Sequence, residues 1–449
     1  MRRRLSREAL ALAALASLSW ANLPDGGGYS PRSIGLAIFG TLLLIAAVTA
    51  PAVPAASPRL LVALTLATVA AYLPYAAAHH ALAPTVVAIV CCAPLVIVVG
   101  SARRRRLVIA LGATGLGGLL FQGWRWGSIG IDVFASVQAA AAKVLQGRNP
   151  YDAVFTTYVL TPPSRLTAER IHYQYGPLLP YLTAPGRLIG DVRVLSLVAF
   201  VALGACALGL ARRSPHRERL LPVVTALCLG FPFVVLMVIN AWVDVFMMAG
   251  FAGWLTLRAR HPRWAVLLLA GALLVKPTLL IVLIVPLVWS RSMRRECCVA
   301  ALAAALFTLP FALVTGPAQL YHDVIGVQLG FPPRTDSLTL SSALYWSGHG
   351  MVPGAVALIG TAAVALVVLR RRPDDLADVL LGSAVISTVS FVLAKWAYFN
   401  YYFIPAVLLV LYLASRGVPL GPDGDVATPS WARHRRRLGL PVRLTTEAA

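Results

Sequence analysis

The sequence predicts an all-α polytopic integral membrane protein, and two observations support this class. Of the 449 residues, 59% are hydrophobic and only 12% are charged, whereas a soluble protein carries about twice that charged share. Apolar runs recur along the chain, and we expect about 12–14 transmembrane helices from them, because about 20 residues of helix span the bilayer core. Backbone groups in lipid must bond internally, so the runs are expected to be helices.

The balance of charge indicates how the chain is oriented. Lys and Arg number 39, against 17 Asp and Glu, and the arginines form short clusters between apolar runs. This is the pattern of cytoplasmic loops, so we expect no nucleic-acid partner. The clusters lie at Arg2–Arg4, Arg103–Arg106, Arg212–Arg219, Arg258–Arg263, Arg291–Arg295, Arg370–Arg372 and Arg433–Arg437. If all of them are cytoplasmic, the polar loops 123–193 and 316–350 face outward, and each is expected to contain interfacial helices.

The apolar runs divide the chain in order. They lie at about 9–23, 33–50, 60–78, 85–100, 107–122, 194–211, 220–239, 242–258, 264–290, 297–315, 351–369, 376–394 and 401–415. Residues 1–106 form an N-terminal extension of about four helices, 107–415 a core, and 416–449 a basic cytoplasmic tail expected to be disordered.

Two runs need a more specific interpretation. The run 264–290 has arginines at both ends that favour the cytoplasm, so we expect a hairpin or broken helix with its tip at Lys276-Pro277. The stretch 177–190 contains Pro180 and Pro185 and is interpreted as an interfacial or re-entrant helix. The first run, which follows Met1 and three arginines, could also be a signal peptide, but so apolar a chain favours a first transmembrane helix.

Other classes of chemistry find no support in the sequence. The six cysteines lie in apolar runs without a Cys-x-x-Cys pair, so we expect neither a metal site nor a disulfide framework. No phosphate-binding loop for nucleotide hydrolysis and no serine-hydrolase elbow is present. We therefore expect no metal and no cofactor.

Asp132 is the candidate catalytic residue. It follows the run 107–122, where a membrane helix emerges on the outer side, and it precedes a predicted helix over 134–145 that Gly147 and Pro150 terminate. A carboxylate in this position either caps the following helix or is a reactive group. Position alone leaves both possibilities open.

Several motifs near Asp132 and beyond it resemble those of a known family. They are Gly147-Arg-Asn-Pro-Tyr151, Tyr175-Gly-Pro-Leu178, Asn240-Ala-Trp-Val-Asp244, Ala270-Gly271 with Val275-Lys-Pro-Thr278, and Tyr398-Phe-Asn-Tyr-Tyr402. In order and spacing from about residue 107 to 415, the chain resembles the GT-C membrane glycosyltransferases, most closely glycosyltransferase family 87 (the DUF2029 group). Gly176 stands where the pattern usually has Pro, and Ile239-Asn240 where Gly-Gln is usual. These departures affect the assignment of the exact subfamily and of the acceptor more than the assignment of the class.

The resemblance implies a GT-C-like bundle and a specific reaction. Such an enzyme is expected to transfer a hexose, which the resemblance implies is mannose, from a polyprenyl-phosphate donor in the outer leaflet to a cell-envelope glycolipid or polysaccharide. Asp132 would accept the proton of the acceptor hydroxyl. The donor phosphate needs cations, for which the candidates are Lys276, Lys395, Arg148, Arg125 and Arg334. Alternatively, Lys276 and Lys395 extend to the outer interface as anchors.

The expected sugar- and acceptor-binding residues lie at outer helix ends. They are Tyr173, Tyr175, Asn240, Asp244, Tyr398, Asn400 and Tyr401. The alternative for the aromatic residues is the interfacial belt of membrane proteins. A polytopic transporter or lipid-linked-sugar flippase is the rival function, but transporters place charges near mid-membrane, whereas here polar residues gather on one side. The expected location is a bacterial plasma membrane, with a multi-pass chain and an active site on the extracytoplasmic side.

Overall fold

The structure is a computed structural model that describes residues 6–22, 29–50, 56–74, 90–125, 132–161, 165–330 and 334–420. At residues 119, 122–125, 157–161 and 165–169 it describes the backbone only. Within these ranges the protein is nearly all α-helical, with one two-stranded antiparallel sheet.

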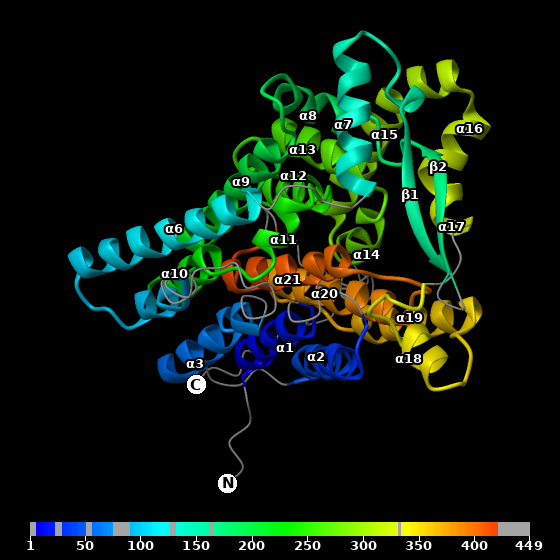
Figure 1. Ribbon diagram of the computed structural model, residues 1–449. Helices are drawn as coiled ribbons and strands as arrows, with labels where there is room; N and C mark the ends of the chain where they lie inside the picture. The colour runs from blue at the N-terminus through cyan, green and yellow to red at the C-terminus, as the bar shows by residue number, and fades with distance from the viewer. Residues whose placement is uncertain are drawn as a thin grey trace, which may run out of the picture.

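The elements follow one another along the chain as a succession of helices interrupted once by the sheet (Figure 1). They are α1 (Arg7–Asn22), α2 (Pro31–Thr49), α3 (Pro58–Val69), η1 (Ala93–Ile97), α6 (Ala102–Arg125), α7 (Asp132–Leu145), η2 (Pro150–Asp152), β1 (Val154–Thr161), β2 (Arg165–His172), α8 (Leu179–Leu188), α9 (Arg193–Arg213), α10 (Arg217–Leu229), α11 (Val234–Ile239), α12 (Asp244–Leu257), α13 (Pro262–Val275), α14 (Leu279–Trp289), α15 (Arg291–Thr315), α16 (Pro317–Tyr321), η3 (His322–Gly326), α17 (Val327–Gly330), α18 (Leu340–Trp346), α19 (Gly354–Leu369), α20 (Leu376–Leu393) and α21 (Phe399–Ala414).

Apolar helices with exposed apolar faces mark the chain as a membrane protein. Among the described residues, the helices α2, α9, α15 and α20 are long and apolar enough to cross a bilayer. On α15, Leu313 and Val314 are 73% and 75% exposed, and on α19 Leu358 is 71% exposed. A soluble protein rarely leaves contiguous apolar surface of this kind open to water, whereas lipid is a favourable environment for it.

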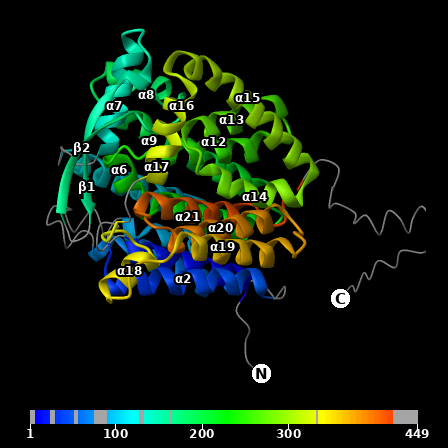
Figure 2. The ribbon, with the colours of Figure 1, turned by 90° about the vertical axis from the view of Figure 1, so that its right-hand side faces the viewer.

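The centre of the bundle is formed by α20 and α21. Both are buried along nearly their whole length, and α2, α14 and α19 pack against α20. In Figure 2 the helices α2, α19, α20 and α21 run side by side. A second group, in which α12 packs between α9 and α13, lies on the other side of α21. Because α21 contacts both groups, residues at its N-terminus can meet residues from either.

Ion pairs connect α1 to the centre at one end of the bundle. The Arg219 guanidinium binds both carboxylate oxygens of Glu8, at 2.7 and 2.6 Å, and Glu8 is only 4% exposed. Arg416 approaches Glu8 at 3.8 Å and Asp375 at 3.3 Å. The N-terminal helices therefore pack as part of the bundle, while the division of the chain at residue 106 stays a prediction.

Most apolar runs fold as predicted, with two informative differences. The run 264–290 is broken at Lys276-Pro277 into α13 and α14, as expected. The run 220–239 is not one helix: it divides into α10 and α11 around Gly230-Phe-Pro232, because proline lacks an N–H and clashes with the preceding turn. The expected span 85–100 begins outside the described residues, and its described end contains only the short η1.

The two polar loops that were predicted to face outward contain more structure than the sequence indicated. In the first, α7 ends as predicted, with Gly147 at φ 67 and the Arg148 amide bonded to the Lys143 carbonyl, which is a Schellman motif. The proline-containing stretch 177–190 forms α8, and the hairpin β1–β2 was not anticipated. In the second loop, α16, η3, α17 and α18 are short helices. The tail from residue 421 lies outside the described residues.

Candidate functional site

A buried polar cluster lies where α12, the α13–α14 break and α21 meet. The Lys276 ammonium donates to Oδ1 of Asp244 at 2.9 Å, and the Asn400 amide donates to Oδ2 at 2.9 Å. Lys276 Nζ also lies 4.5 Å from the centroid of the Tyr401 ring. Asp244 is 0% and Lys276 8% exposed. Four residues predicted from three separate motifs therefore form one cluster.

Local backbone structure explains how the two charges come to face each other. Asp244 is the first residue of α12, and Lys276 follows the last residue of α13. A carboxylate at a helix N-terminus and a cation at a C-terminus are each favoured by the helix dipole. Ala241, in the turn before α12, has φ 51, a left-handed conformation that a residue with a side chain adopts at a cost. This turn brings α12 back so that Asp244 points into the protein.

Asp132 lies near this cluster and near a second one. It is the first residue of α7 and is partly exposed. Its carboxylate is close enough to interact electrostatically with Tyr175, Tyr401 and Arg334. At a helix N-terminus a carboxylate is also stabilised by the dipole, so position alone still permits a structural role.

The second cluster joins Arg334 and Asp336, from the loop 316–350, to Tyr398, which precedes α21. Arg334 binds Asp336 through two nitrogens, at 3.1 and 2.8 Å. Its guanidinium lies 4.9 Å from the centroid of the Tyr398 ring, and the Tyr398 hydroxyl donates to Asp336 at 2.8 Å. Burial holds the pKa of Tyr398 well above its ordinary value, so its hydroxyl remains a donor. Arg334 has five N–H groups; two of them bind Asp336 and a further side-chain hydrogen bond joins it to Tyr398 among the described residues.

Burial distinguishes among the predicted tyrosines. Tyr173 is 0% and Tyr175 6% exposed, and the Tyr173 hydroxyl donates to the Gly176 carbonyl at 3.1 Å. The two rings contact each other edge to face at 5.8 Å. Burial raises the pKa of both phenols. Tyr173 therefore stabilises the loop 173–178, whereas Tyr398 and Tyr401 are partly exposed.

That loop is joined to the break before Lys276 by its backbone. The Gly176 amide donates to the Val275 carbonyl at 3.0 Å, and the Leu178 amide to the Leu274 carbonyl at 3.4 Å. A Cβ atom on Gly176 would lie 1.9 Å from the Leu274 oxygen and 2.4 Å from its carbonyl carbon. Only glycine permits this close approach.

We therefore expect Gly176→Ala to destabilise the protein by about 1–3 kcal/mol and to reduce activity. The methyl group must displace the backbone that places Lys276. The change is measured as the melting temperature in detergent micelles together with turnover. Gly271→Ala is the matched control, since its Cβ meets only Leu178 Cδ2 at 3.4 Å. A Gly176→Ala melting temperature equal to that of the control would contradict the prediction.

The other predicted cations lie apart from this centre. Arg148 is exposed beyond the C-terminus of α7, about 20 Å along the helix from Asp132. Lys395 donates to the Leu329 carbonyl at 2.6 Å and so binds the end of α17. The side chain of Arg125 lies outside the described residues. Asn240 ends α11 and is partly exposed, beside the turn that precedes Asp244.

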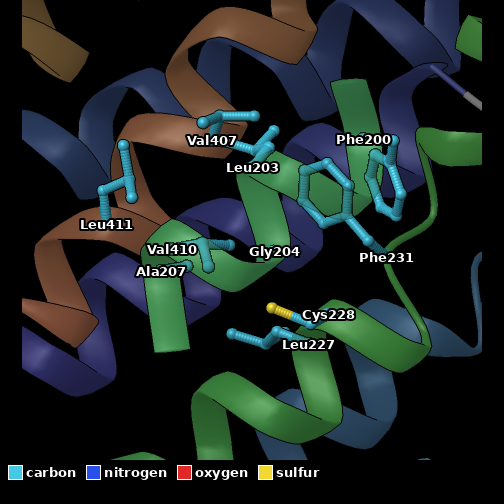
Figure 3. Close-up of a pocket in the computed structure, with 10 residues that line it drawn as sticks. All are labelled: Phe200, Leu203, Gly204, Ala207, Leu227, Cys228, Phe231, Val407, Val410 and Leu411. Atoms are coloured by element: carbon cyan, nitrogen blue, oxygen red, sulfur yellow. The ribbon is translucent and has the colours of Figure 1, made fainter. Parts of the chain in front are cut away.

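A separate cavity between α9, α10 and α21 carries no reactive chemistry (Figure 3). Its lining is apolar apart from one thiol and consists of Phe200, Leu203, Gly204, Ala207, Leu227, Cys228, Phe231, Val407, Val410 and Leu411. Its volume is about 20 Å³, which is close to the space of one water. No group of His, Cys, Asp and Glu suited to a metal ion occurs among the described residues.

Sequence reasoning missed Asp336. The only signal was Arg334-Thr-Asp336 in a polar outer loop, and a short Arg-x-Asp motif is common on protein surfaces. The hydroxyl that donates a hydrogen bond to Asp336 belongs to Tyr398, which is 62 residues away in the sequence.

The comparisons with known proteins agree with the motif order. Residues 173–395 match the family model of glycosyltransferase family 87. The matched region includes Asp244, Lys276 and Arg334, and it begins after Asp132. No curated protein and no solved structure matches the chain.

Proposed function

The chain belongs to glycosyltransferase family 87, and we propose that it transfers a hexose from a polyprenyl-phosphate donor to a cell-envelope glycolipid or polysaccharide. Mannose is the sugar we propose. The finer parts of the proposal are the GT-C-like bundle of about 12–14 spanning helices, the bacterial plasma membrane and a reaction on the extracytoplasmic side.

One observation carries the proposal: a partly exposed carboxylate, Asp132, lies close enough to the Arg334 guanidinium for the two charges to interact. Transfer of a sugar from a phosphate needs a base for the acceptor hydroxyl and a cation for the leaving phosphate. Both groups are partly exposed, so substrates can reach them. Asp132 also interacts electrostatically with Tyr401, whose ring faces the buried Lys276.

In the proposed step, the acceptor oxygen attacks C1 of the donor sugar. The bond between C1 and the phosphate oxygen breaks, and the phosphate leaves with the electron pair. Asp132 takes the acceptor's proton as this happens. Arg334, held by Asp336 and the Tyr398 ring, binds the leaving phosphate with its remaining N–H groups.

The contacts of Lys276 favour a different role from the one its sequence position indicated. Its charge is compensated by Asp244 at 2.9 Å, so the pair as a whole attracts a phosphate weakly. We propose that Asp244, Lys276 and Asn400 hold the start of α21, and that Tyr401 from this helix presents a face to the substrate.

The direct test is a transfer assay with the purified protein in lipid nanodiscs. Polyprenyl-phosphate mannose is the donor, a pool of envelope glycolipids supplies acceptors, and products are identified by mass spectrometry. We expect a gain of one hexose on a lipid acceptor with loss of the donor, and no product when a nucleotide-linked mannose replaces it. Movement of the donor between leaflets in liposomes without any product would favour the flippase instead.

A further inference from the structure

A basic cavity lies at the end of the bundle opposite Asp132, among helices far apart in the sequence. Its volume is about 250 Å³. Arg7 comes from α1, Trp289 ends α14, Arg371 and Arg372 follow α19, and Asp378 lies in the first turn of α20. The helices α2, α19 and α20, which run side by side in Figure 2, form its frame. A cavity built from several elements keeps its shape better than a single flexible loop.

The charges in this cavity are unequal. Three arginines face a single carboxylate, Asp378, which binds Arg7 at 3.3 Å and lies 4.0 Å from Arg416. Within the described part of the chain, Arg371 and Arg372 form no ion pair with a carboxylate. The protein leaves this excess of positive charge uncompensated. The binding of an anion in the cavity is therefore favourable.

Binding to the end of α2 orients two of the arginines without using all their donors. The Arg7 Nε donates to the Ala50 carbonyl at 3.0 Å, and Arg371 donates to the carbonyls of Val48 and Thr49. Cations at a helix C-terminus are favoured by the helix dipole. This explains why Arg7 and Arg371 lie at the end of α2, but it does not explain the position of Arg372. Each guanidinium has five N–H groups, so several remain for an anion.

Apolar side chains adjoin the arginines of this cavity. The Trp289 indole donates to the Leu369 carbonyl at 3.1 Å, and Leu381 completes the lining. Nearby, Leu366 on α19 is 52% exposed and Leu42 on α2 is 58% exposed. A ligand that fits has an anionic group for the arginines and hydrocarbon chains for these faces.

We propose that this cavity binds the phosphate headgroup of an anionic phospholipid in the cytoplasmic leaflet. Basic pockets between transmembrane helices on that side are suited to such headgroups. The proposal rests on the membrane placement proposed above and not on the transferase activity. Its consequence is that an anionic lipid joins α1, α2, α19 and α20 at this end of the bundle.

The test compares the parent protein with Arg372→Gln and with Arg371→Gln/Arg372→Gln. Arg372 forms no bond to α2, so its replacement leaves that helix end intact. The control is Arg103→Gln/Arg104→Gln, which removes two exposed arginines from α6. Each protein is placed in phosphatidylcholine nanodiscs with increasing phosphatidylglycerol, and its melting temperature and retained lipid (by native mass spectrometry) are measured.

We expect phosphatidylglycerol to raise the melting temperature of the parent and the control. In the double variant at Arg371 and Arg372 its apparent affinity should fall on the order of tenfold or more, with a smaller fall for Arg372→Gln. Equal responses of all four proteins would overturn the proposal. Equal protection by inorganic phosphate in phosphatidylcholine would also overturn it, because the site would then recognise a free anion.

Discussion

Replacing Asp132 with Asn should reduce the rate of sugar transfer by at least about 10²-fold, the usual scale for a positioned proton transfer. Asn has nearly the same shape and can still cap the start of α7, but it cannot accept a proton. Folding and donor binding should therefore remain nearly unchanged. The measurements are turnover in the transfer assay, the melting temperature, and the donor dissociation constant.

The matched control is Asp152→Asn, an exposed carboxylate of the same loop 123–193 that lies in η2. It should keep near-parental turnover. If Asp132 only caps α7, Asp132→Asn behaves like this control, and the base is then sought at Asp336, the other partly exposed carboxylate beside Arg334. A variant with normal turnover thus removes Asp132 from the mechanism with one substitution.

The sequence was sufficient to predict the class of fold and the break at Lys276. Hydrophobic runs are long and regular in a membrane protein, and Pro277 between two arginine clusters left few alternatives. The motifs at Asp244, Lys276 and Asn400 were expected to lie on the same side for the same reason. Their side-chain partners were not predictable, because the contact from Asn400 to Asp244 spans 156 residues and depends on how α12 and α21 pack.

Two local signals were present in the sequence but were missed. The segment Val154-Phe-Thr-Thr-Tyr-Val-Leu-Thr161 is rich in β-branched and aromatic residues, which is typical of a strand, yet it lies in a chain whose other apolar segments are helical. Gly230-Phe-Pro232 lies inside an apolar run, where proline breaks a helix. In each case the helical pattern of the whole chain was given more weight than the local signal for a strand or a helix break.

Removing either charge of the Asp244–Lys276 pair should destabilise the protein by about 3–5 kcal/mol, because the remaining charge is left buried without its partner. In Lys276→Met the carboxylate of Asp244, 0% exposed, keeps only the hydrogen bond from Asn400. In Asp244→Asn the ammonium group of Lys276 keeps its contact with the Tyr401 ring but loses its carboxylate partner. The measurement is unfolding in detergent micelles, followed by turnover and donor KM for variants that remain folded.

The double variant Asp244→Asn/Lys276→Met separates a structural role from phosphate binding. It has no charge left at the positions of this pair, and Met is close to Lys in length, so its stability should return to within about 1.5 kcal/mol of the parent. If the pair only holds the start of α21, donor KM should also return to near the parental value. A stable double variant whose donor KM stays raised tenfold or more would instead mean that Lys276 contacts the donor phosphate. In that variant the fold is restored, but the cation that would bind the phosphate is still missing.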